Sequence, residues 1–316
     1  MDKKEKVIVI CGPTASGKTS LSIELAKKIN GEIVSADSMQ IYKDMDIGTA
    51  KPTLEEMQGI KHYLIDFVSP DERYSVADYK KDAKKAIREI IKKGKTPIVV
   101  GGTGLYVDSL IYEIEYPEIE FDEKYREELE KRVDKEGLDK LYEEAKNIDE
   151  KAIEKISKND KKRILRILEI YHATGKNKTE QEIESRKKEV EFDYHVFAIN
   201  WDREKLYERI NKRVDLMIEQ GLINEVKEIL KKYNNFPTAM QGLGYKEVVD
   251  YLNGVLTKEE MIEKIKMETR RYAKRQLTWF RKNKQTIWLK GKDNLQNNIK
   301  IILEGINWDK KNKRNN

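Results

Sequence analysis

The sequence predicts an α/β fold, a parallel sheet with flanking helices, interrupted by an all-helical insertion. Three observations predict it. Short β-rich runs alternate with helical patterns in the first part of the chain, a glycine-rich phosphate loop follows the first run, and no convincing strand occurs from Glu118 to Lys188. We therefore expect a core formed by residues 1–117 and 193–308, a helical insertion at 118–192, and a polar tail at 309–316.

Composition supports a globular protein. The 316 residues are 38% hydrophobic and 38% charged, with a net charge of +6 that suits a polyanionic partner without establishing one. One cysteine, Cys11, rules out a disulfide or a cysteine-based zinc site. The N-terminus leads directly into the first apolar run, and no run reaches transmembrane length. We expect a cytoplasmic monomer that binds neither membrane nor zinc.

The expected elements follow from apolar periodicity and from turn residues. Helical patterns occupy Ser20–Lys28 and Val76–Lys93. Runs typical of strands, each bounded by turn residues, are Val7–Cys11, Glu32–Ala36, Tyr63–Phe67, Thr96–Val100, Tyr194–Ile199 and Thr286–Leu289.

The loop after the first strand matches the pattern G-x-x-x-x-G-K-[ST]. It reads Gly12, Pro13, Thr14, Ala15, Ser16, Gly17, Lys18 and Thr19, with a strand before it and a helix after it. The two glycines let backbone N–H groups turn toward phosphate oxygens at the positive end of the helix. Lys18 adds a positive charge, and the Thr19 hydroxyl can bind a phosphate-bound Mg²⁺. The loop therefore predicts a phosphorylated ligand, without saying which.

Two further strands end on polar residues. Asp37 follows the second strand, and Thr103 follows Gly101 and Gly102 after the fourth. Because ligands of parallel sheets bind at the carboxyl ends of strands, we expect both side chains beside the phosphate loop. Asp37 could hold Mg²⁺ or accept a proton, and the alternative is an Asx turn or helix cap. The glycines permit close approach of a ligand, or simply a tight strand-to-helix turn.

A nucleotide hydrolase often carries a metal-holding aspartate at the end of a buried strand. The strand Thr96–Val100 ends without one, although Asp66, near the end of Tyr63–Phe67, could take that role. On the phosphate loop alone, a small-molecule kinase therefore remains an alternative.

A basic helix is predicted near the C-terminus. Residues 266–290 hold nine basic residues and one acidic residue. At about 100° per residue, the apolar half would pack on the protein, and the basic half would need a partner such as a phosphate backbone. The alternative is a basic face that is solvated or paired with acidic residues. The apolar half contains Ile265, Tyr272, Ala273, Gln276, Trp279 and Phe280; the basic half contains Lys266, Arg270, Arg271, Lys274, Arg275, Arg281 and Lys282.

Together these elements resemble the family of bacterial tRNA dimethylallyltransferases. The resemblance spans most of the chain, and Asn159 and Tyr63 depart from the family's usual residues. It is carried by the phosphate loop and by the blocks Ser-Ala-Asp-Ser-Met-Gln-Ile-Tyr (35–42), Met-Asp-Ile-Gly-Thr-Ala-Lys-Pro (45–52), Gly-Gly-Thr-Gly-Leu-Tyr (101–106), Asn-Asp-Lys-Lys-Arg-Ile-Leu-Arg-Ile-Leu-Glu-Ile (159–170), Ala-Met-Gln-Gly-Leu-Gly-Tyr-Lys-Glu (239–247) and Thr-Arg-Arg-Tyr-Ala-Lys-Arg-Gln-Leu-Thr-Trp-Phe-Arg (269–281).

The resemblance implies a P-loop fold that binds dimethylallyl diphosphate and Mg²⁺. The diphosphate would bind residues 12–19 and Arg213, with the metal at Thr19. The product would be N6-dimethylallyladenosine at position 37 of tRNAs that read codons starting with U. Asp37 would be the general base for the adenine N6 amine, with Thr103 near the adenine.

The resemblance also implies that the insertion clamps the anticodon stem-loop. The expected tRNA contacts are Asp37, Ser38, Met39, Gln40, Thr103, Arg126, Asn159, Asp160, Lys161, Lys162, Arg163, Arg270, Lys274, Arg275 and Arg281. Three alternatives stay open at this point: the small-molecule kinase, a prenyltransferase acting on free adenine nucleotides, and a non-catalytic RNA-binding protein.

Overall fold

The computed structural model describes residues 4–116, 122–185, 189–292 and 294–307. The chain divides into two compact units, one made of Met1–Val107 with Glu191–Asn316 and the other of Asp108–Val190. The second unit interrupts the first in the sequence, and it starts within helix α4 (Gly104–Ile111), ahead of the expected bound at 118. The expected tail at 309–316 lies outside the described residues.

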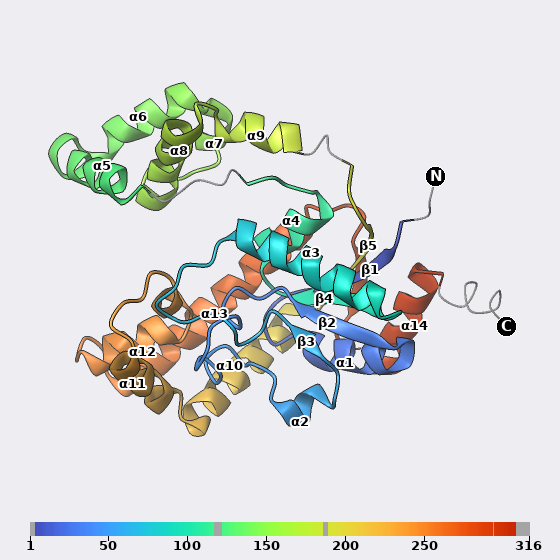
Figure 1. The fold of residues 1–316 in the computed structure, drawn as a ribbon. Helices are drawn as coiled ribbons and strands as arrows, with labels where there is room; N and C mark the ends of the chain where they lie inside the picture. The colour runs from blue at the N-terminus through green and yellow to red at the C-terminus, as the bar shows by residue number, and fades with distance from the viewer. Residues whose placement is uncertain (1–3, 117–121, 186–188, 293, 308–316) are drawn as a thin grey trace. The chain divides into compact units, whose positions relative to one another are not determined.

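A six-stranded parallel sheet forms the core of the first unit (Figure 1). The predicted strands are confirmed except Tyr63–Phe67, of which only Tyr63 pairs. The run ends there because Leu64 and Asp66 have left-handed backbones, with φ of 58° and 57°. The strands are β1 Lys6–Cys11, β2 Gly31–Ser35, β3 His62–Tyr63, β4 Thr96–Gly101, β5 Asp193–Asn200 and β6 Ile287–Lys290.

The strand order is β3-β2-β4-β1-β5-β6, which places β1 at the centre. Ile10 pairs with Val100 of β4 on one side and with Phe197 of β5 on the other. β2 pairs with β4 on the other side of β4 from β1. Because all the strands are parallel, the loops that follow β1, β2 and β4 leave the same edge of the sheet.

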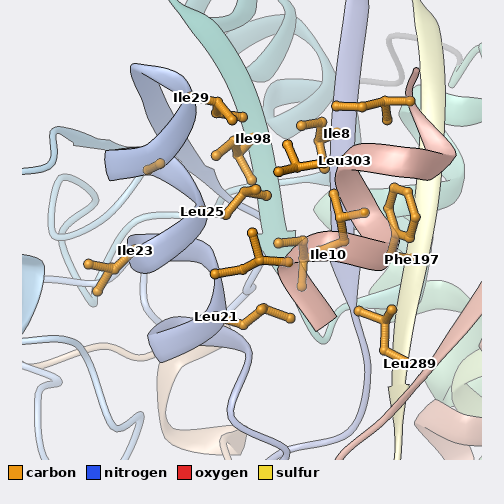
Figure 2. Close-up of a cluster of buried hydrophobic side chains, with 14 of the residues drawn as sticks. Ile8, Ile10, Leu21, Ile23, Leu25, Ile29, Ile98, Phe197, Leu289 and Leu303 are labelled. Atoms are coloured by element: carbon orange, nitrogen blue, oxygen red, sulfur yellow. The ribbon is translucent and has the colours of Figure 1, made fainter. Parts of the chain in front are cut away.

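One face of the sheet packs against helices α1 (Lys18–Ile29) and α14 (Leu295–Gly305). Figure 2 shows Ile8 and Ile10 of β1 among Leu25 of α1 and Leu303 of α14. Alternate residues of β1 turn to this cluster, as the period of two in a strand requires. Burial of these aliphatic side chains fixes α1, and therefore the loop before it, against the sheet.

Helix α3 (Val76–Lys92) lies along β2 and β4 on the other side of the sheet from α1 (Figure 1). A capping box starts it: the Ser75 hydroxyl accepts from Asp78 N–H, and the Asp78 carboxylate accepts from Ser75 N–H. Tyr79 is buried on this helix and stacks on Tyr106 with ring centroids 3.9 Å apart. The helix predicted at Val76–Lys93 is confirmed.

The rest of the first unit is helical and packs on the segment that follows β2. Ile41, Tyr42 and Met45 of that segment are buried among side chains of these helices. This cluster fixes the segment that follows β2 against the helices. The elements are α2 Leu54–Met57, α10 Arg203–Gln220, α11 Leu222–Lys232, the 3₁₀ turn Ala239–Gln241, α12 Tyr245–Leu252 and α13 Lys258–Phe280.

The second unit is helical throughout its described residues, as the sequence predicts. Its own core includes Leu129, Leu141, Ile164 and Leu165, all fully buried. The helices are α5 Glu123–Glu136, α6 Leu138–Ile148, α7 Glu150–Ile153, α8 Lys161–Thr174 and α9 Lys178–Ser185.

Among the described residues of both units, none of the helices is long and apolar enough to span a bilayer.

We predict that Leu25→Ala lowers the free energy of unfolding by about 3 kcal/mol, because it removes a fully buried side chain from the cluster between α1 and the sheet. The matched control is Leu54→Ala, whose side chain is 87% exposed and which should change stability by less than about 0.5 kcal/mol. Urea unfolding of both variants measures the difference. Equal losses would contradict the assignment of this core.

Candidate functional site

The phosphate loop has the backbone geometry of an anion site. Gly12 and Gly17 have φ of 144° and 91°, and a Cβ on Gly12 would lie 3.0 Å from the carbonyl oxygen of Ile199. Helix α1 starts at Lys18 with Gly17 as its N-cap, so no side chain caps it, and no acidic residue lies in its first turn. Its first N–H groups and its positive end therefore face the loop ready for an anion.

Lys18 folds back over the phosphate loop. Its Nζ donates to the carbonyl oxygens of Gly12, at 3.0 Å, and Pro13, at 2.7 Å. Burial and the nearby Arg213 together lower the pKa of Lys18 to about 8, although Asp37 opposes both. A bound anion would favour the protonated form. Lys18 is thus placed to respond to negative charge in the loop.

Arg213 of α10 reaches the same loop. Its Nη1 donates to the Thr14 hydroxyl at 3.3 Å. Burial lowers the pKa of Arg213, as does the neighbouring Arg209, whereas Asp37 raises it. Two half-buried cations, Lys18 and Arg213, therefore lie together without a full complement of negative charge, which favours an anionic ligand.

Arg209 and Trp201 also hold the loop, and sequence reasoning missed both. Arg209 Nε donates to the Ala15 carbonyl at 2.8 Å, and its guanidinium lies 4.5 Å from the Trp201 ring centroid. Trp201 Nε1 donates to the Ser16 carbonyl at 3.0 Å. The only sequence signal was that Arg209 lies one helical turn before Arg213.

Asp37 lies beside the phosphate loop, as expected from its place after β2. Its Oδ1 accepts from the backbone N–H of Met39 at 2.9 Å and of Gln40 at 3.4 Å. These hydrogen bonds form the Asx turn that was the alternative to a chemical role for Asp37. The turn orients the carboxylate, so Asp37 can still act as a proton acceptor. Asp37 interacts electrostatically with Lys18 and Arg213, so the carboxylate and the two cations share one site.

Thr103 joins the loop after β4 to the loop after β2. Its hydroxyl accepts from Ser38 N–H at 3.0 Å and contacts the Ser38 hydroxyl at 3.2 Å. Its own N–H donates to the Ala36 carbonyl at 3.1 Å. Thr103 is thus adjacent to Asp37, and the structure brings the two residues predicted as catalytic to one place.

Gln276 of α13 bridges the two loops and was not predicted as a site residue. Its side chain is 5% exposed; Oε1 accepts from Thr14 N–H at 2.9 Å, and Nε2 donates to the Gly102 carbonyl at 2.8 Å. Tyr272, one turn earlier, contacts Thr103, and burial raises its pKa to about 12 with a further contribution from Asp37. α13 therefore forms one wall of the site.

The glycines after β4 serve this packing. A Cβ on Gly101 would lie 2.0 Å from the Ala36 carbonyl, and one on Gly102 would lie 2.3 Å from Gln276 Nε2. A Cβ on Gly104 would lie 2.4 Å from the Trp279 ring. Protein atoms thus approach these glycines closely, and none of the three has a positive φ, so packing explains them better than the turn considered as the alternative.

Thr19 and Asp37 offer the oxygen atoms that suit Mg²⁺. Thr19 lies in the first turn of α1, and Asp37 uses only Oδ1 in its turn hydrogen bonds. Among the described residues, no group of three or more His, Cys, Asp or Glu could hold a metal ion. One hydroxyl and one carboxylate fit a Mg²⁺ ion bound chiefly by ligand phosphates and water.

Asp66, considered as an alternative metal ligand, binds Lys51 instead. Lys51 Nζ lies 2.6 Å from Asp66 Oδ1 and 2.6 Å from Asp46 Oδ1, and it donates to the Tyr42 carbonyl. The left-handed turn that ends β3 directs Asp66 into this ion pair, so the metal role considered for it is not supported.

The basic helix is less isolated than predicted. The apolar half packs inward as expected, with Ala273, Gln276 and Phe280 buried. The alternative of a face paired within the protein holds for three of the seven basic residues. Lys266 pairs with Asp215 at 2.8 Å, Arg270 donates to Asn211 at 2.6 Å, and Arg271 pairs with Glu268 at 2.5 Å. The exposed basic surface is formed by Lys274, Arg275, Arg281 and Lys282.

The predicted tRNA residues of the insertion lie in the helical unit. Arg126 forms ion pairs with Glu130 at 3.0 Å and Glu169 at 2.8 Å, which join α5 to α8. Asp160 caps α8 by accepting from Arg163 N–H at 3.1 Å. Asn159, Lys162 and Arg163 are exposed and Lys161 is half-buried, so three cations surround the positive end of α8. The Asp160 carboxylate already occupies the helix end and lies 3.4 Å from the Arg163 guanidinium, so any phosphate contact there would depend on the cations.

The comparisons with known proteins agree with one another. The IPP transferase family matches residues 40–283. A tRNA dimethylallyltransferase of Acetivibrio thermocellus is 53% identical over 299 residues, which is 94% of this chain and 95% of that protein. One from Caldanaerobacter subterraneus is 51% identical over 279 residues, which is 87% of this chain and 89% of that protein.

Solved structures are also similar. The tRNA isopentenylpyrophosphate transferase of Bacillus halodurans is 41% identical, with a TM-score of 0.73 over 98% of this chain and 100% of that one. A eukaryotic dimethylallyltransferase acting on tRNA is 34% identical, with a TM-score of 0.77 over 92% of this chain and 74% of that one. The chain therefore belongs to the IPP transferase family.

Proposed function

We propose that this protein transfers the dimethylallyl group of dimethylallyl diphosphate to N6 of adenosine 37, in tRNAs that read codons starting with U. One observation carries the proposal: two cations, Lys18 and Arg213, lie at the phosphate loop next to the carboxylate of Asp37. The cations suit a diphosphate leaving group, and the carboxylate suits a proton acceptor. Relatives named tRNA dimethylallyltransferase support the same reaction.

The donor would bind with its diphosphate on the N–H groups of the phosphate loop. Lys18 and Arg213 would stabilise the negative charge that develops as the C1–O bond breaks and its electron pair leaves with the diphosphate. Mg²⁺ held through Thr19 would neutralise part of that charge when it is bound. The groups that would bind the diphosphate of the donor thus lie in the loop after β1, at the start of α1 and on α10.

The acceptor would present its adenine to the loops after β2 and β4. The N6 lone pair is delocalised into the ring, so it attacks the allylic C1 only as that carbon becomes cationic. As the C1–N6 bond forms, Asp37 would take the N6 proton, with Thr103 beside it. The base must leave its stack to reach this site.

The tRNA itself would bind basic groups on both units. Lys274, Arg275 and Arg281 form an exposed surface on and just after α13, and Lys161, Lys162 and Arg163 surround the start of α8. Contacts of this kind bind phosphates and give salt-dependent affinity. A tRNA substrate supports a cytoplasmic location, and the monomer stays a prediction.

The test is mass spectrometry of nucleosides from unmodified tRNA that has been incubated with the protein, Mg²⁺ and dimethylallyl diphosphate. We expect a new N6-dimethylallyladenosine peak that disappears when the diphosphate is omitted. The same assay with free AMP tests the alternative acceptor. Formation of ADP from ATP without the new peak would favour a kinase, and RNA binding without any product would favour a non-catalytic protein.

We predict that Asp37→Asn lowers kcat by about 10²–10⁴, because the amide cannot accept the N6 proton. The substitution keeps a side-chain oxygen for the N–H groups of Met39 and Gln40, so the turn and the affinity for RNA should persist. Single-turnover kinetics and a filter-binding assay measure the two quantities. A variant that turns over at the wild-type rate would remove Asp37 from the role of base.

We predict that affinity for inorganic diphosphate falls above about pH 8 in the wild-type protein relative to a variant whose residue 18 stays charged. Lys18 is charged below its pKa of about 8 and loses its charge as the pH rises through that value, while the bound anion favours the charged form. Calorimetric titration from pH 7 to 9.5 measures the profile. Lys18→Arg, which stays charged, is the control: its profile should be flatter, and identical profiles would contradict the assignment.

A further inference from the structure

A carboxylate in α11 binds three consecutive backbone N–H groups of a distant loop. Glu225 Oε2 accepts from Asp46 N–H at 3.0 Å and from Ile47 N–H at 2.6 Å, and Oε1 accepts from Gly48 N–H at 3.1 Å. A fourth donor, the hydroxyl of Tyr245, lies 2.6 Å from Oε1. One carboxylate thus accepts hydrogen bonds from the first three N–H groups of loop 46–51. This loop belongs to no helix or strand.

The packing around this carboxylate is tight. Tyr245 is fully buried, and a Cβ on Gly48 would lie 2.5 Å from its ring, so the loop approaches the ring only because position 48 is glycine. Burial raises the pKa of Tyr245, and the neighbouring Glu225 raises it further. The phenol therefore stays protonated and continues to donate to the carboxylate.

The other end of loop 46–51 is fixed by a lysine. Lys51 Nζ binds the carboxylates of Asp46 and Asp66 and the Tyr42 carbonyl, and its side chain is only 6% exposed. Within the loop, Lys51 N–H donates to the Asp46 carbonyl, which closes the turn. The loop is thus held at both ends by charged groups and has one defined conformation.

The carbonyl groups of this loop hold the side chain of Gln40. Its Nε2 donates to the carbonyl oxygens of Thr49 and Ala50, both at 3.2 Å. Carbonyl oxygens only accept, so the amide must turn its NH₂ to the loop and its Oε1 away from it. Gln40 N–H also donates to Asp37 Oδ1 at 3.4 Å. Gln40 therefore offers an acceptor of fixed orientation, close in the chain to the carboxylate of Asp37.

We propose that Glu225 is a positioning residue of the acceptor site. Through loop 46–51, Glu225 fixes the amide of Gln40, so that Oε1 accepts a hydrogen bond from an amino group of the RNA. The inference rests on the proposed function, because it supposes an RNA acceptor at Asp37. Without the carboxylate, the three N–H groups of the loop would lose their acceptor, and Thr49 and Ala50 would no longer hold the amide in place.

A purely structural anchor would act differently. If Glu225 only joined α11 to the loop, its loss would lower stability and affect the kinetic constants for both substrates, or for neither. If it positions Gln40, its loss should raise the KM for RNA alone, because Gln40 contacts the acceptor and takes no part in the departure of diphosphate.

The experiment compares Glu225→Gln with Glu228→Gln in the full-length protein, using an anticodon stem-loop RNA and dimethylallyl diphosphate. Glu228 lies on the same helix, is exposed, and pairs only with Lys231 among the described residues. We expect Glu225→Gln to raise the KM for RNA about tenfold, with kcat and the KM for the donor within about twofold of wild type. Glu228→Gln should behave as wild type.

A double mutant tests whether Glu225 acts through Gln40. Gln40→Met removes both polar ends of the amide, and adding Glu225→Gln to it should not raise the KM for RNA further. Tyr245→Phe removes one of the four groups that donate to the Glu225 carboxylate. It should raise the KM for RNA by about twofold. This variant takes the place of Glu225→Gln if Glu225→Gln does not fold.

Two results would overturn the inference. One is equal behaviour of the Glu225 and Glu228 variants, and the other is a double mutant whose KM for RNA is the product of the two single effects. A wild-type protein that forms no N6-dimethylallyladenosine would instead overturn the proposed function, so the two failures are distinguishable.

Discussion

The buried amide of Gln276 is the interaction on which the site depends. It accepts from Thr14 N–H in the phosphate loop and donates to the Gly102 carbonyl in the loop after β4. A buried carbonyl left without a donor costs about 1–3 kcal/mol, so the two loops and α13 are stable together in this one arrangement. Because α13 also carries the exposed cations, the basic surface and the phosphate loop are parts of the same packed unit.

Electrostatics divides the site into two halves. On the donor side, burial lowers the pKa of both Lys18 and Arg213, Arg213 lowers that of Lys18 further, and Arg209 lowers that of Arg213 further. A bound anion would offset these effects by favouring the charged forms. On the acceptor side, Asp37 supplies the negative charge that partly balances these cations. Cations and carboxylate are fixed by folding before any substrate arrives, which is the arrangement that lowers the cost of charge separation in a transition state.

The acceptor side is built from hydrogen-bond acceptors that are themselves held in place. Asp37 is oriented by backbone N–H groups of its own turn, and Gln40 is oriented by carbonyls of loop 46–51. The Glu225 carboxylate in turn fixes that loop by accepting hydrogen bonds from three of the loop's backbone N–H groups. Such a chain of contacts supports side chains that a loop presents, because each one is held by hydrogen bonds from the next layer of residues.

The sequence by itself determined the parts that depend on local pattern. The strands β1, β2, β4 and β5 follow from apolar runs between turns, and the phosphate loop follows from glycines and a lysine at fixed spacing. The strand expected at Tyr63–Phe67 was wrong because an apolar run does not reveal the left-handed backbone at Leu64 and Asp66. Only the tertiary structure decided the roles of Gln276 and Glu225. Glu225 lies 178 positions from Ile47, whose N–H it accepts, and a hydrogen bond across that distance depends on how distant elements pack, which no local pattern of residues encodes.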